Sequence, residues 1–263
     1  MSETAVRMEV DRRGVATVTL NRPEVHNAFG EALIAELATT FRGIAADQGV
    51  RVMVLAGNGE SFSAGADLTW MKRLSAASPA ENMADSLNFA EMLRELAEMP
   101  KPTIARVHGA AFGGGVGLVA ACDIAIASEA AVFALSEVRL GLIPAVISPY
   151  VTAAMGPRHA GRYAISGERL DASAAHRLGL VHEVVAKDGL DAAIARAVEE
   201  LLTCGPEAQA DAKRLIRDVA DRPIDGAIRE LTASRIAHRR ATAEGKEGVA
   251  AFLEKRKPAW MRA

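Results

Sequence analysis

The chain is poor in cysteine and in aromatic residues, and it carries no strong net charge of either sign. Its two cysteines, Cys122 and Cys204, have no metal-ligand spacing, and two cysteines in 263 residues do not make a disulfide scaffold. Aromatic residues make up 4% of the chain, and the formal net charge is −2. Neither base stacking nor attraction to phosphates therefore indicates a nucleic-acid partner, and the cysteine content fits a reducing compartment.

Long hydrophobic runs are also absent. Half of the residues are hydrophobic, yet no stretch approaches the roughly 18 consecutive apolar residues of a membrane span. The first residues, MSETAVRMEVDRRG, lack the apolar segment of a signal peptide. We therefore expect a cytoplasmic protein. Because 263 residues are long for a single core, we expect one main domain with an appendage.

Strand and helix patterns alternate along most of the chain. Residues 15–20 alternate as a strand does and are followed by Pro23, and residues 31–47 have apolar side chains at helical spacing. Further strands are expected near residues 51–59, 102–109, 123–128, 131–135 and 180–185, and further helices near 66–74, 80–99, 114–122 and 171–179. Apolar strands followed by helices are typical of an α/β fold in which helices cover the sheet.

The strand patterns stop after about residue 190. Three helical patterns follow, at residues 190–203, 206–220 and 225–254, the last with a break near Gly245. We predict a core of residues 1–195 and a helical C-terminal region of residues 196–263. The basic run EKRKPAWMR near the end is, by composition alone, most simply a solvated helix end.

One stretch, HGAAFGGGVGLVAACDIAIAS at residues 108–128, is unusually rich in glycine. Its segment GVGLVA matches a dinucleotide fingerprint, but five residues separate the glycines from the preceding strand, which a true fingerprint does not allow. A hydrolase elbow, G-x-S-x-G, is missing, since the nearest segment, GESFS, lacks the last glycine. Two explanations stay open: close packing, or a loop that offers backbone N–H groups to a ligand where a helix begins.

A second loop of small residues, SFSAGAD at residues 61–67, also lies between an expected strand and an expected helix. Ala66 can present its N–H in the same way as the glycines. Two such loops on successive strand–helix units could converge on one carbonyl oxygen. Two converging N–H donors stabilise an oxygen that acquires negative charge during a reaction.

Several segments occur in the order seen in the crotonase, or enoyl-CoA hydratase/isomerase, superfamily. They include NRPEVHNAF, SFSAGADL, HGAAFGGGVGL, ACDIAIAS, LSEVRLGLIP, ISGERLDASAAHRLGLVHEVV and AAFLEKRK, and they are spread over residues 21–257, nearly the whole chain. The chain therefore resembles this superfamily. The resemblance implies a spiral of ββα units, a C-terminal helical trimerisation region, and a homotrimer or a dimer of trimers.

The resemblance also implies a site for an acyl-CoA thioester. Ala66 and Gly114 match the two N–H donors to the thioester carbonyl. The backbone at Ala64, Asp67 and Leu68 would cradle the adenine, and Phe252 with Lys255 would reach the CoA of an adjacent subunit. Residues that can line an acyl pocket, or simply belong to the core, are Trp70, Met71, Val146, Ile147 and Tyr150.

Related hydratases use two glutamates, and only one is present here. Glu137 matches the second, whereas the position of the first is Gly117, which has no side chain to hold a proton. The missing side chain suggests room for a branched or acidic acyl group. Without the motif, Glu137 would be read as a carboxylate paired with Arg139. Asp123 is expected to be a structural carboxylate and His108 a satisfied core histidine.

Three functions follow from the resemblance. The first is hydration of a branched 2-enoyl-CoA, because the closest resemblance is to bacterial methylglutaconyl-CoA hydratases of leucine and isoprenoid catabolism, in which glycine also replaces the first glutamate. The second is enoyl-CoA isomerisation by one glutamate. The third is a protein that binds CoA thioesters without turnover. No metal or further cofactor is expected, since CoA enters as part of the substrate.

Overall fold

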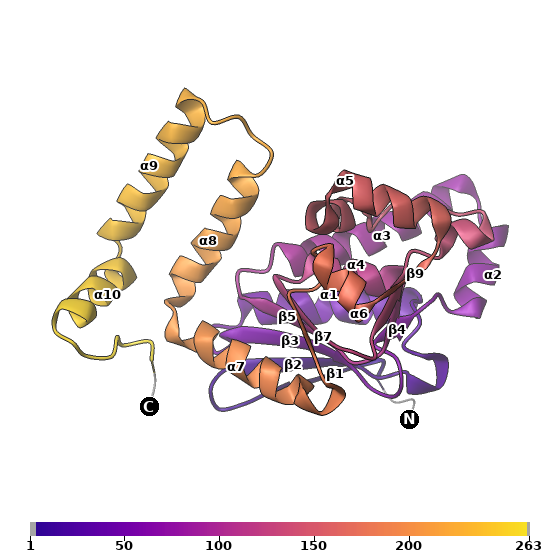
Figure 1. Cartoon of the computed structure of the whole chain (residues 1–263), viewed down its shortest axis with the longest axis horizontal. Coiled ribbons are helices and arrows are strands. Elements are labelled where there is room, and N and C mark those ends of the chain that lie inside the picture. The colour runs from indigo at the N-terminus through magenta and orange to yellow at the C-terminus, as the bar shows by residue number, and fades with distance from the viewer. Residues whose placement is uncertain (1–3, 262–263) are drawn as a thin grey trace.

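The computed structural model describes residues 4–261, which form two sheets and a set of covering helices (Figure 1). The large sheet has the strand order β1-β2-β3-β5-β7-β10, and only β1 is antiparallel to its neighbour. Its strands are β1 (Val6–Val10), β2 (Val15–Leu20), β3 (Val52–Gly57), β5 (Thr103–Val107), β7 (Ile124–Ser128) and β10 (Glu183–Val185).

The small sheet has the order β4-β6-β8-β9, with β4, β6 and β8 parallel and β9 antiparallel to β8. Its strands are very short: β4 (Ser63–Ala64), β6 (Ala110–Phe112), β8 (Val132–Ala134) and β9 (Arg169–Asp171). Of these strands, the sequence pattern predicts only β8, within the expected strand at residues 131–135. The other three have two or three residues, which are too few to show the alternation of apolar and polar residues in a strand.

The helices are α1 (Glu31–Ala46), α2 (Leu68–Ala76), α3 (Pro79–Ala97), α4 (Gly114–Ala121), α5 (Ser148–Ser166), α6 (Ala172–Arg177), α7 (Leu190–Thr203), α8 (Pro206–Val219), α9 (Gly226–Ala241) and α10 (Ala243–Leu253). Short 3-10 turns are η1 (Pro23–Val25), η2 (Glu137–Leu140) and η3 (Lys187–Gly189). None of the helices within residues 4–261 is both long and apolar enough to cross a membrane.

The chain repeats a ββα unit, as the resemblance implied. β3 enters the large sheet, β4 the small sheet, and α2 and α3 follow; β5, β6 and α4 repeat the pattern, and β7, β8 and α5 repeat it again. Each repeat therefore adds one strand to each sheet and then a helix. The α/β class and the spiral of ββα units are confirmed.

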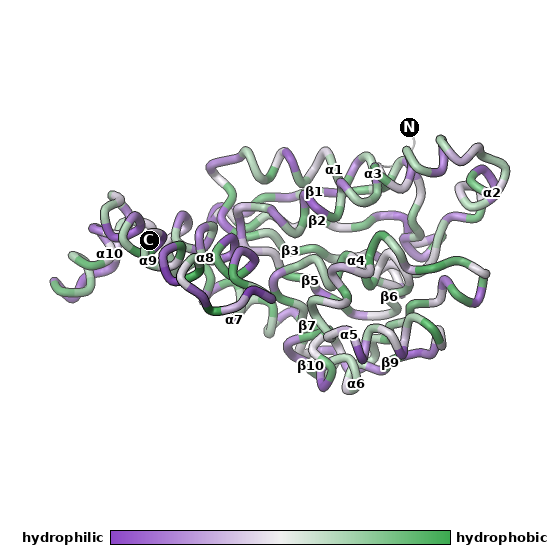
Figure 2. The backbone as a smooth tube through the Cα atoms, turned by 90° about the horizontal axis from the view of Figure 1, so that it is seen from above, coloured by the Kyte–Doolittle hydropathy of each residue, from purple (hydrophilic) through white to green (hydrophobic). Residues whose placement is uncertain are grey.

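Both faces of the large sheet are covered. One core cluster joins residues of α1, α3, α4 and α5 with side chains from both sheets. A second cluster packs Leu190, Ile194 and Val198 of α7 against strand residues such as Val54 and Ile104 on the other face. Figure 1 shows the large sheet between α7 on one side and α4 and α5 on the other, and Figure 2 shows that much of β3 and β5 is hydrophobic. This two-sided burial explains why the parallel strands are nearly continuous apolar runs.

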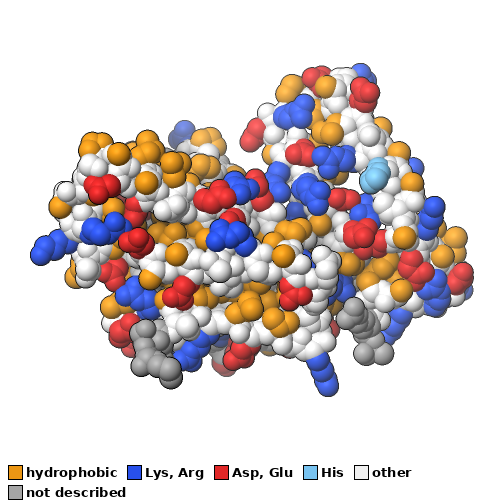
Figure 3. Space-filling model, turned by 180° about the vertical axis from the view of Figure 1, so that it is seen from behind, with side chains coloured by type: hydrophobic (Ala, Val, Ile, Leu, Met, Phe, Trp, Pro, Cys, Tyr) orange, Lys and Arg blue, Asp and Glu red, His pale blue; other side chains and the backbone are white. Residues whose placement is uncertain are grey.

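Helices α8, α9 and α10 form an arm that stands away from both sheets (Figure 1). The sequence-based boundary at residue 195 falls inside α7, which is one unbroken helix packed on the large sheet. In the structure the arm therefore begins after α7, at Gly205. Hydrophobic side chains lie on the surface of the arm, at the right of Figure 3. They include Ile216, Ile224, Val249, Phe252 and Leu253, each more than half exposed.

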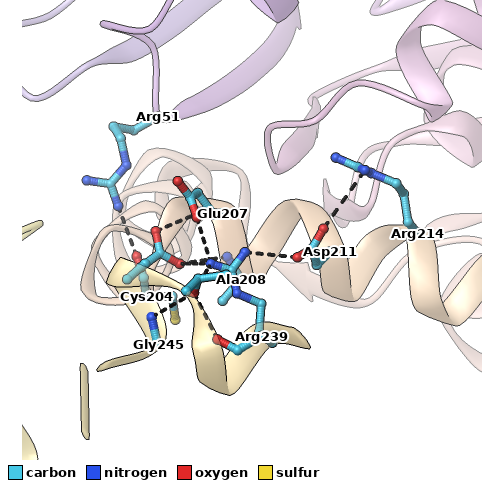
Figure 4. Close-up of polar contacts among 10 residues, drawn as sticks. Arg51, Cys204, Glu207, Ala208, Asp211, Arg214, Arg239 and Gly245 are labelled. Carbon is cyan, nitrogen blue, oxygen red and sulfur yellow. Dashed lines mark hydrogen bonds and ion pairs between the residues drawn. The ribbon is translucent and has the colours of Figure 1, made fainter. Parts of the chain in front are cut away.

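A cluster of charges holds the arm helices together (Figure 4). The guanidinium of Arg239, on α9, lies 2.7 Å from Glu207 and 2.9 Å from Asp211, both on α8. Glu244, on α10, accepts hydrogen bonds from the backbone N–H groups of Glu207 and Ala208 at the start of α8. A carboxylate at this position satisfies free N–H groups and suits the positive end of the helix.

An ion pair between α8 and the residue after α4 connects the arm to the core. Lys213 of α8 lies 2.6 Å from Asp123, which follows α4 and also accepts hydrogen bonds from the backbone and side chain of Thr103. Asp123 is thus a structural carboxylate, as expected. It links the first residue of β5, the end of α4 and the arm.

We predict that Arg239→Met loosens the arm while the core stays folded. The substitution leaves Glu207, Asp211 and Glu244 close together without their shared cation, at a cost of roughly 1–3 kcal/mol. Hydrogen exchange in residues 205–261 should become faster by about 10-fold or more. Arg214→Met is the matched control, because Arg214 is on the same cluster but exposed and 3.9 Å from Asp211. Equal effects of the two substitutions would contradict the prediction.

Candidate active site

The carboxyl ends of the parallel strands of the small sheet bring three segments together. Ala66 lies two residues after β4, Gly114 two residues after β6, and Glu137 three residues after β8. These strands are neighbours in the order β4-β6-β8, and neighbouring strands lie about 4.8 Å apart. Ligands of parallel sheets bind at this edge. The three residues expected to act on the thioester therefore follow adjacent strand ends.

The backbone N–H of Ala66 points away from the neighbouring segment, which contains Phe29. Phe29 pairs with Ala66 in a parallel bridge: its N–H donates to the carbonyl of Gly65 at 3.1 Å, and its carbonyl accepts from the N–H of Asp67 at 2.7 Å. In such a bridge the N–H of the middle residue points to the opposite side. The N–H of Ala66 is thus free of this pairing.

Gly114 is the first residue of α4, so its N–H belongs to the first turn, which has no acceptor within the helix. The preceding Gly113 has φ +53°, in the left-handed region that favours glycine. A Cβ atom at Gly115 would lie 2.2 Å from the carbonyl oxygen of Ser63 in β4. Glycine is therefore required for packing, and that packing places the positive end of α4 at the strand ends. The packing explanation of the glycine stretch is therefore confirmed, and the role of its N–H groups in ligand binding stays a prediction.

Glu137 carries a half-buried carboxyl group without an ion pair. A Cβ atom at Gly113 would lie 3.0 Å from its Oε1, so the carboxyl lies beside the start of α4. Its Oε2 is buried and has no hydrogen-bond partner within residues 4–261. Burial raises the pKa of Glu137. Arg139 does not pair with it, since the Nε of Arg139 donates to the carbonyl of Gly167 at 3.0 Å. The geometry suits a group that takes up and returns a proton.

The space beside Gly117 is filled, which corrects the sequence-based idea that its missing side chain leaves room for an acyl group. A Cβ atom at Gly117 would lie 2.4 Å from Cγ2 of Ile147, and 3.6 Å from Cδ1 of Leu93. Ile147 precedes α5 and is 2% exposed. Its branched side chain occupies the volume that a larger residue at position 117 would need.

The loop after β4 is held by its own polar contacts. Asp67 accepts hydrogen bonds from the N–H groups of Thr69 and Trp70 at the start of α2, and it lies 2.8 Å from Arg22. The hydrogen bond from Arg22 lowers the pKa of Asp67. Its side chain is therefore engaged within the protein, which leaves backbone groups of this loop for a ligand. The N–H of Ala64 is also engaged, since it donates to the carbonyl of His26.

The expected acyl-pocket residues fall into two groups. Val146, Tyr150 and Trp70 are partly buried and pack against the main core cluster. The indole N–H of Trp70 donates to Asp85 at 3.0 Å, which connects α2 to α3. Met71 is also partly exposed, whereas Ile147 is buried. The role of these residues in acyl binding stays a prediction. Leu68, whose backbone is expected to contact the adenine, has a side chain that is 82% exposed.

Two expected CoA contacts are not near the site within one chain. Phe252 and Lys255 lie at the end of the arm, and Phe252 is 82% exposed (Figure 1).

His108 has one satisfied nitrogen, with Nε2 2.9 Å from the carbonyl of Gly59, while its buried Nδ1 has no partner within the described chain. Burial lowers the pKa of His108, so its neutral form is favoured at pH 7.

Sequence reasoning missed two residues of the site. Gly113 supplies the left-handed turn that starts α4 beside Glu137. Phe29 lies between the Ala66 loop and Gly114 and is 2% exposed. An isolated phenylalanine between a strand and a helix gives no signal in the sequence, because its contacts, with Ala66 and Gly114, are 37 and 85 residues further along.

Comparison with known proteins agrees with this geometry. The family model described as enoyl-CoA hydratase/isomerase matches residues 11–263. A solved enoyl-CoA hydratase from Shewanella pealeana has a TM-score of 0.95 and 44% identity, covering 97% of this chain and 96% of that one.

Two curated relatives come from Escherichia coli. 1,2-epoxyphenylacetyl-CoA isomerase is 34% identical over 94% of each chain. 2,3-dehydroadipyl-CoA hydratase is 31% identical over 98% of each chain. The matches span nearly the full length of this chain and of the proteins it resembles. The protein is thus a member of the enoyl-CoA hydratase/isomerase, or crotonase, family.

Proposed function

We propose that the protein is a hydratase of branched 2-enoyl-CoA thioesters, with 3-methylglutaconyl-CoA or a near relative as substrate. The observation that carries this proposal is the position of Glu137: a half-buried carboxyl beside the start of α4, without an ion pair within residues 4–261. Ala66 and Gly114 follow the two neighbouring strands at the same edge. One proton carrier and two N–H donors are the groups that enolate chemistry of a thioester needs.

In the proposed reaction, Glu137 takes a proton from water as the water oxygen bonds to C3 of the substrate. The electron pair of the C2–C3 double bond moves toward C1, and the carbonyl oxygen becomes an enolate oxygen. The N–H groups of Ala66 and Gly114 stabilise this charge; each such donor typically contributes about 10²- to 10³-fold in rate. Protonation of C2 from Glu137 completes the addition and restores the carboxylate.

The acyl preference rests on the missing first glutamate, whose position is Gly117. Gly117 has no side chain, and Ile147 fills the space beside it. No carboxylate of the protein therefore acts from that position. In the proposal, the carboxylate of the substrate itself or an ordered water shares the proton transfer with Glu137. We include no metal and no further cofactor, since CoA enters with the substrate, and we place the reaction in the cytoplasm.

Isomerisation is the second candidate. A single carboxylate that removes a proton from C2 of a 3-enoyl-CoA and returns it to C4 needs only Glu137 and the two donors. The relative named 1,2-epoxyphenylacetyl-CoA isomerase supports keeping this candidate. A protein that binds CoA thioesters without turnover is the third, because the donor loops do not depend on the missing glutamate.

The arm fits a homotrimer or a dimer of trimers. Its exposed apolar side chains, Phe252 at 82% and Leu253 at 73%, are available to a neighbouring subunit. In such an assembly, Phe252 and Lys255 would reach the CoA bound to the adjacent subunit.

The substrate prediction is tested by the absorbance of the conjugated thioester with 3-methylglutaconyl-CoA, crotonyl-CoA and a 3-enoyl-CoA. We expect loss of absorbance to be fastest with the branched acid. Glu137→Gln should lower that rate by about 10²- to 10⁴-fold, as expected for loss of a general acid–base group. Gain of absorbance with the 3-enoyl-CoA alone would make the protein an isomerase. No change with any substrate, together with measurable CoA-thioester binding, would favour the binding protein.

The burial of Glu137 predicts a pH-dependent effect on stability. The raised pKa means that the folded protein holds the proton more tightly than the unfolded chain, so stability falls as pH rises through the folded-state pKa. Glu137→Gln should therefore raise the melting temperature relative to the native protein at pH 7, and less so at pH 4, where the carboxyl is protonated. A lower melting temperature of the variant at pH 7 would indicate a compensating partner for the carboxylate.

The packing at Gly117 predicts that a glutamate there needs a second substitution. Gly117→Glu alone should destabilise the protein and give no hydration of crotonyl-CoA, because Ile147 occupies the space. Gly117→Glu with Ile147→Ala should recover part of the lost stability. Ile147→Ala alone is the control for the cavity. Full stability of the single Gly117→Glu variant would contradict this packing argument.

A further inference from the structure

Phe29 connects the two N–H donor loops through its main chain and its side chain. Its N–H donates to Gly65 at 3.1 Å, and its carbonyl accepts from Asp67 at 2.7 Å. These two hydrogen bonds are formed on either side of Ala66. The peptide group that carries the Ala66 N–H is therefore oriented by the main chain of Phe29.

The ring of Phe29 lies against Gly114. A Cβ atom at Gly114 would lie 2.7 Å from Cδ2 and 2.8 Å from Cε2 of this ring. Phe89 of α3 packs against the ring of Phe29, with the two ring centroids 5.0 Å apart. Cζ of Phe89 lies 3.0 Å from the same Cβ position. The first residue of α4 thus rests on the aromatic face formed by these two rings.

The segment that carries Phe29 is itself fixed. The side-chain amide of Asn27, fully buried, donates to the carbonyls of Ser61 and Phe62 at 3.0 and 3.1 Å. Its side-chain oxygen accepts from the N–H of Arg22 at 2.8 Å. Since Asn27 holds the segment two residues before Phe29, Phe29 cannot follow a shift of one donor loop without losing contact with the other.

We propose that Phe29 is a positioning residue that sets the separation of the Ala66 and Gly114 N–H groups. This inference rests on the proposed function, because it assigns those groups to one thioester carbonyl. Donors act on a developing oxyanion when they lie about 2.7–3.1 Å from it, so a small shift of one donor weakens the transition state more than the bound substrate. A smaller side chain at position 29 removes the surface on which the start of α4 rests.

The kinetic test compares Phe29→Leu with Phe41→Leu. Phe41 of α1 is equally buried in the same core cluster, and the closest neighbours of Gly114 are Phe29 and Phe89 rather than Phe41. Both substitutions remove one ring from the core. We expect Phe29→Leu to lower kcat by about 10- to 100-fold with little change in KM, in line with the effect of misplaced catalytic groups. Phe41→Leu should keep kcat within about twofold while melting temperature falls for both variants.

A spectroscopic test does not depend on turnover. Hydrogen bonds from the two N–H groups lower the C=O stretching frequency of a bound thioester, which is measured by infrared difference spectra with butyryl-CoA labelled with ¹³C at the thioester carbonyl. The native protein and Phe41→Leu should show the same downward shift, and Phe29→Leu a smaller one. Thermal unfolding of each variant confirms that the compared proteins are folded.

The outcomes separate the two proposals. A full downward shift and unchanged kcat in Phe29→Leu would overturn the role of Phe29 and leave the thioester site intact. Absence of any shift in the native protein with butyryl-CoA bound would overturn the proposed function, and with it the inference. Equal loss of kcat in Phe29→Leu and Phe41→Leu would assign the effect of Phe29 to general core packing.

Discussion

The first turn of α4 can lie against β4 only because residues 113–115 carry no side chains. A Cβ atom at Gly115 would overlap the carbonyl of Ser63, and one at Gly114 would overlap the ring of Phe29. Side chains at these positions would push α4 away from the small sheet. The N-terminus of α4 would then no longer lie at the strand ends where Ala66 and Glu137 are found. The same close packing therefore fixes the helix and exposes its first N–H groups to a ligand.

The environment of Glu137 lowers the stability of the folded protein. A buried carboxyl oxygen without a partner is unfavourable, and most buried polar groups in folded proteins are satisfied. The nearby cation, Arg139, is engaged by the carbonyl of Gly167. An ion pair between Glu137 and an arginine would favour folding, but it would hold the carboxylate in its charged form. In the proposed function, this unpaired carboxyl sacrifices stability for the ability to exchange a proton.

The arm and the core are held by different kinds of interaction. The core depends on apolar burial on both faces of the large sheet. The arm depends on Arg239 and its three carboxylates, and on Lys213 with Asp123. Polar contacts of this kind orient the arm helices without covering their apolar side chains. Several of these side chains, such as Phe252 and Leu253, remain exposed in the single chain, which is the kind of surface that a binding partner covers.

Several features followed from the sequence alone. The α/β class follows from the alternation of apolar strands and amphipathic helices. Helices α7, α8 and α9 begin at Leu190, Pro206 and Gly226, within one residue of the expected positions. The order of the motifs identified the family and pointed to Ala66, Gly114 and Glu137. Only the tertiary structure showed that β4 and β6 exist, because strands of two or three residues form through hydrogen bonds to neighbours distant in sequence. It also showed that Ile147 fills the space beside Gly117 and that Phe29 joins the two donor loops. Local patterns record which residues are apolar along one element, whereas these contacts depend on where separate elements meet in space.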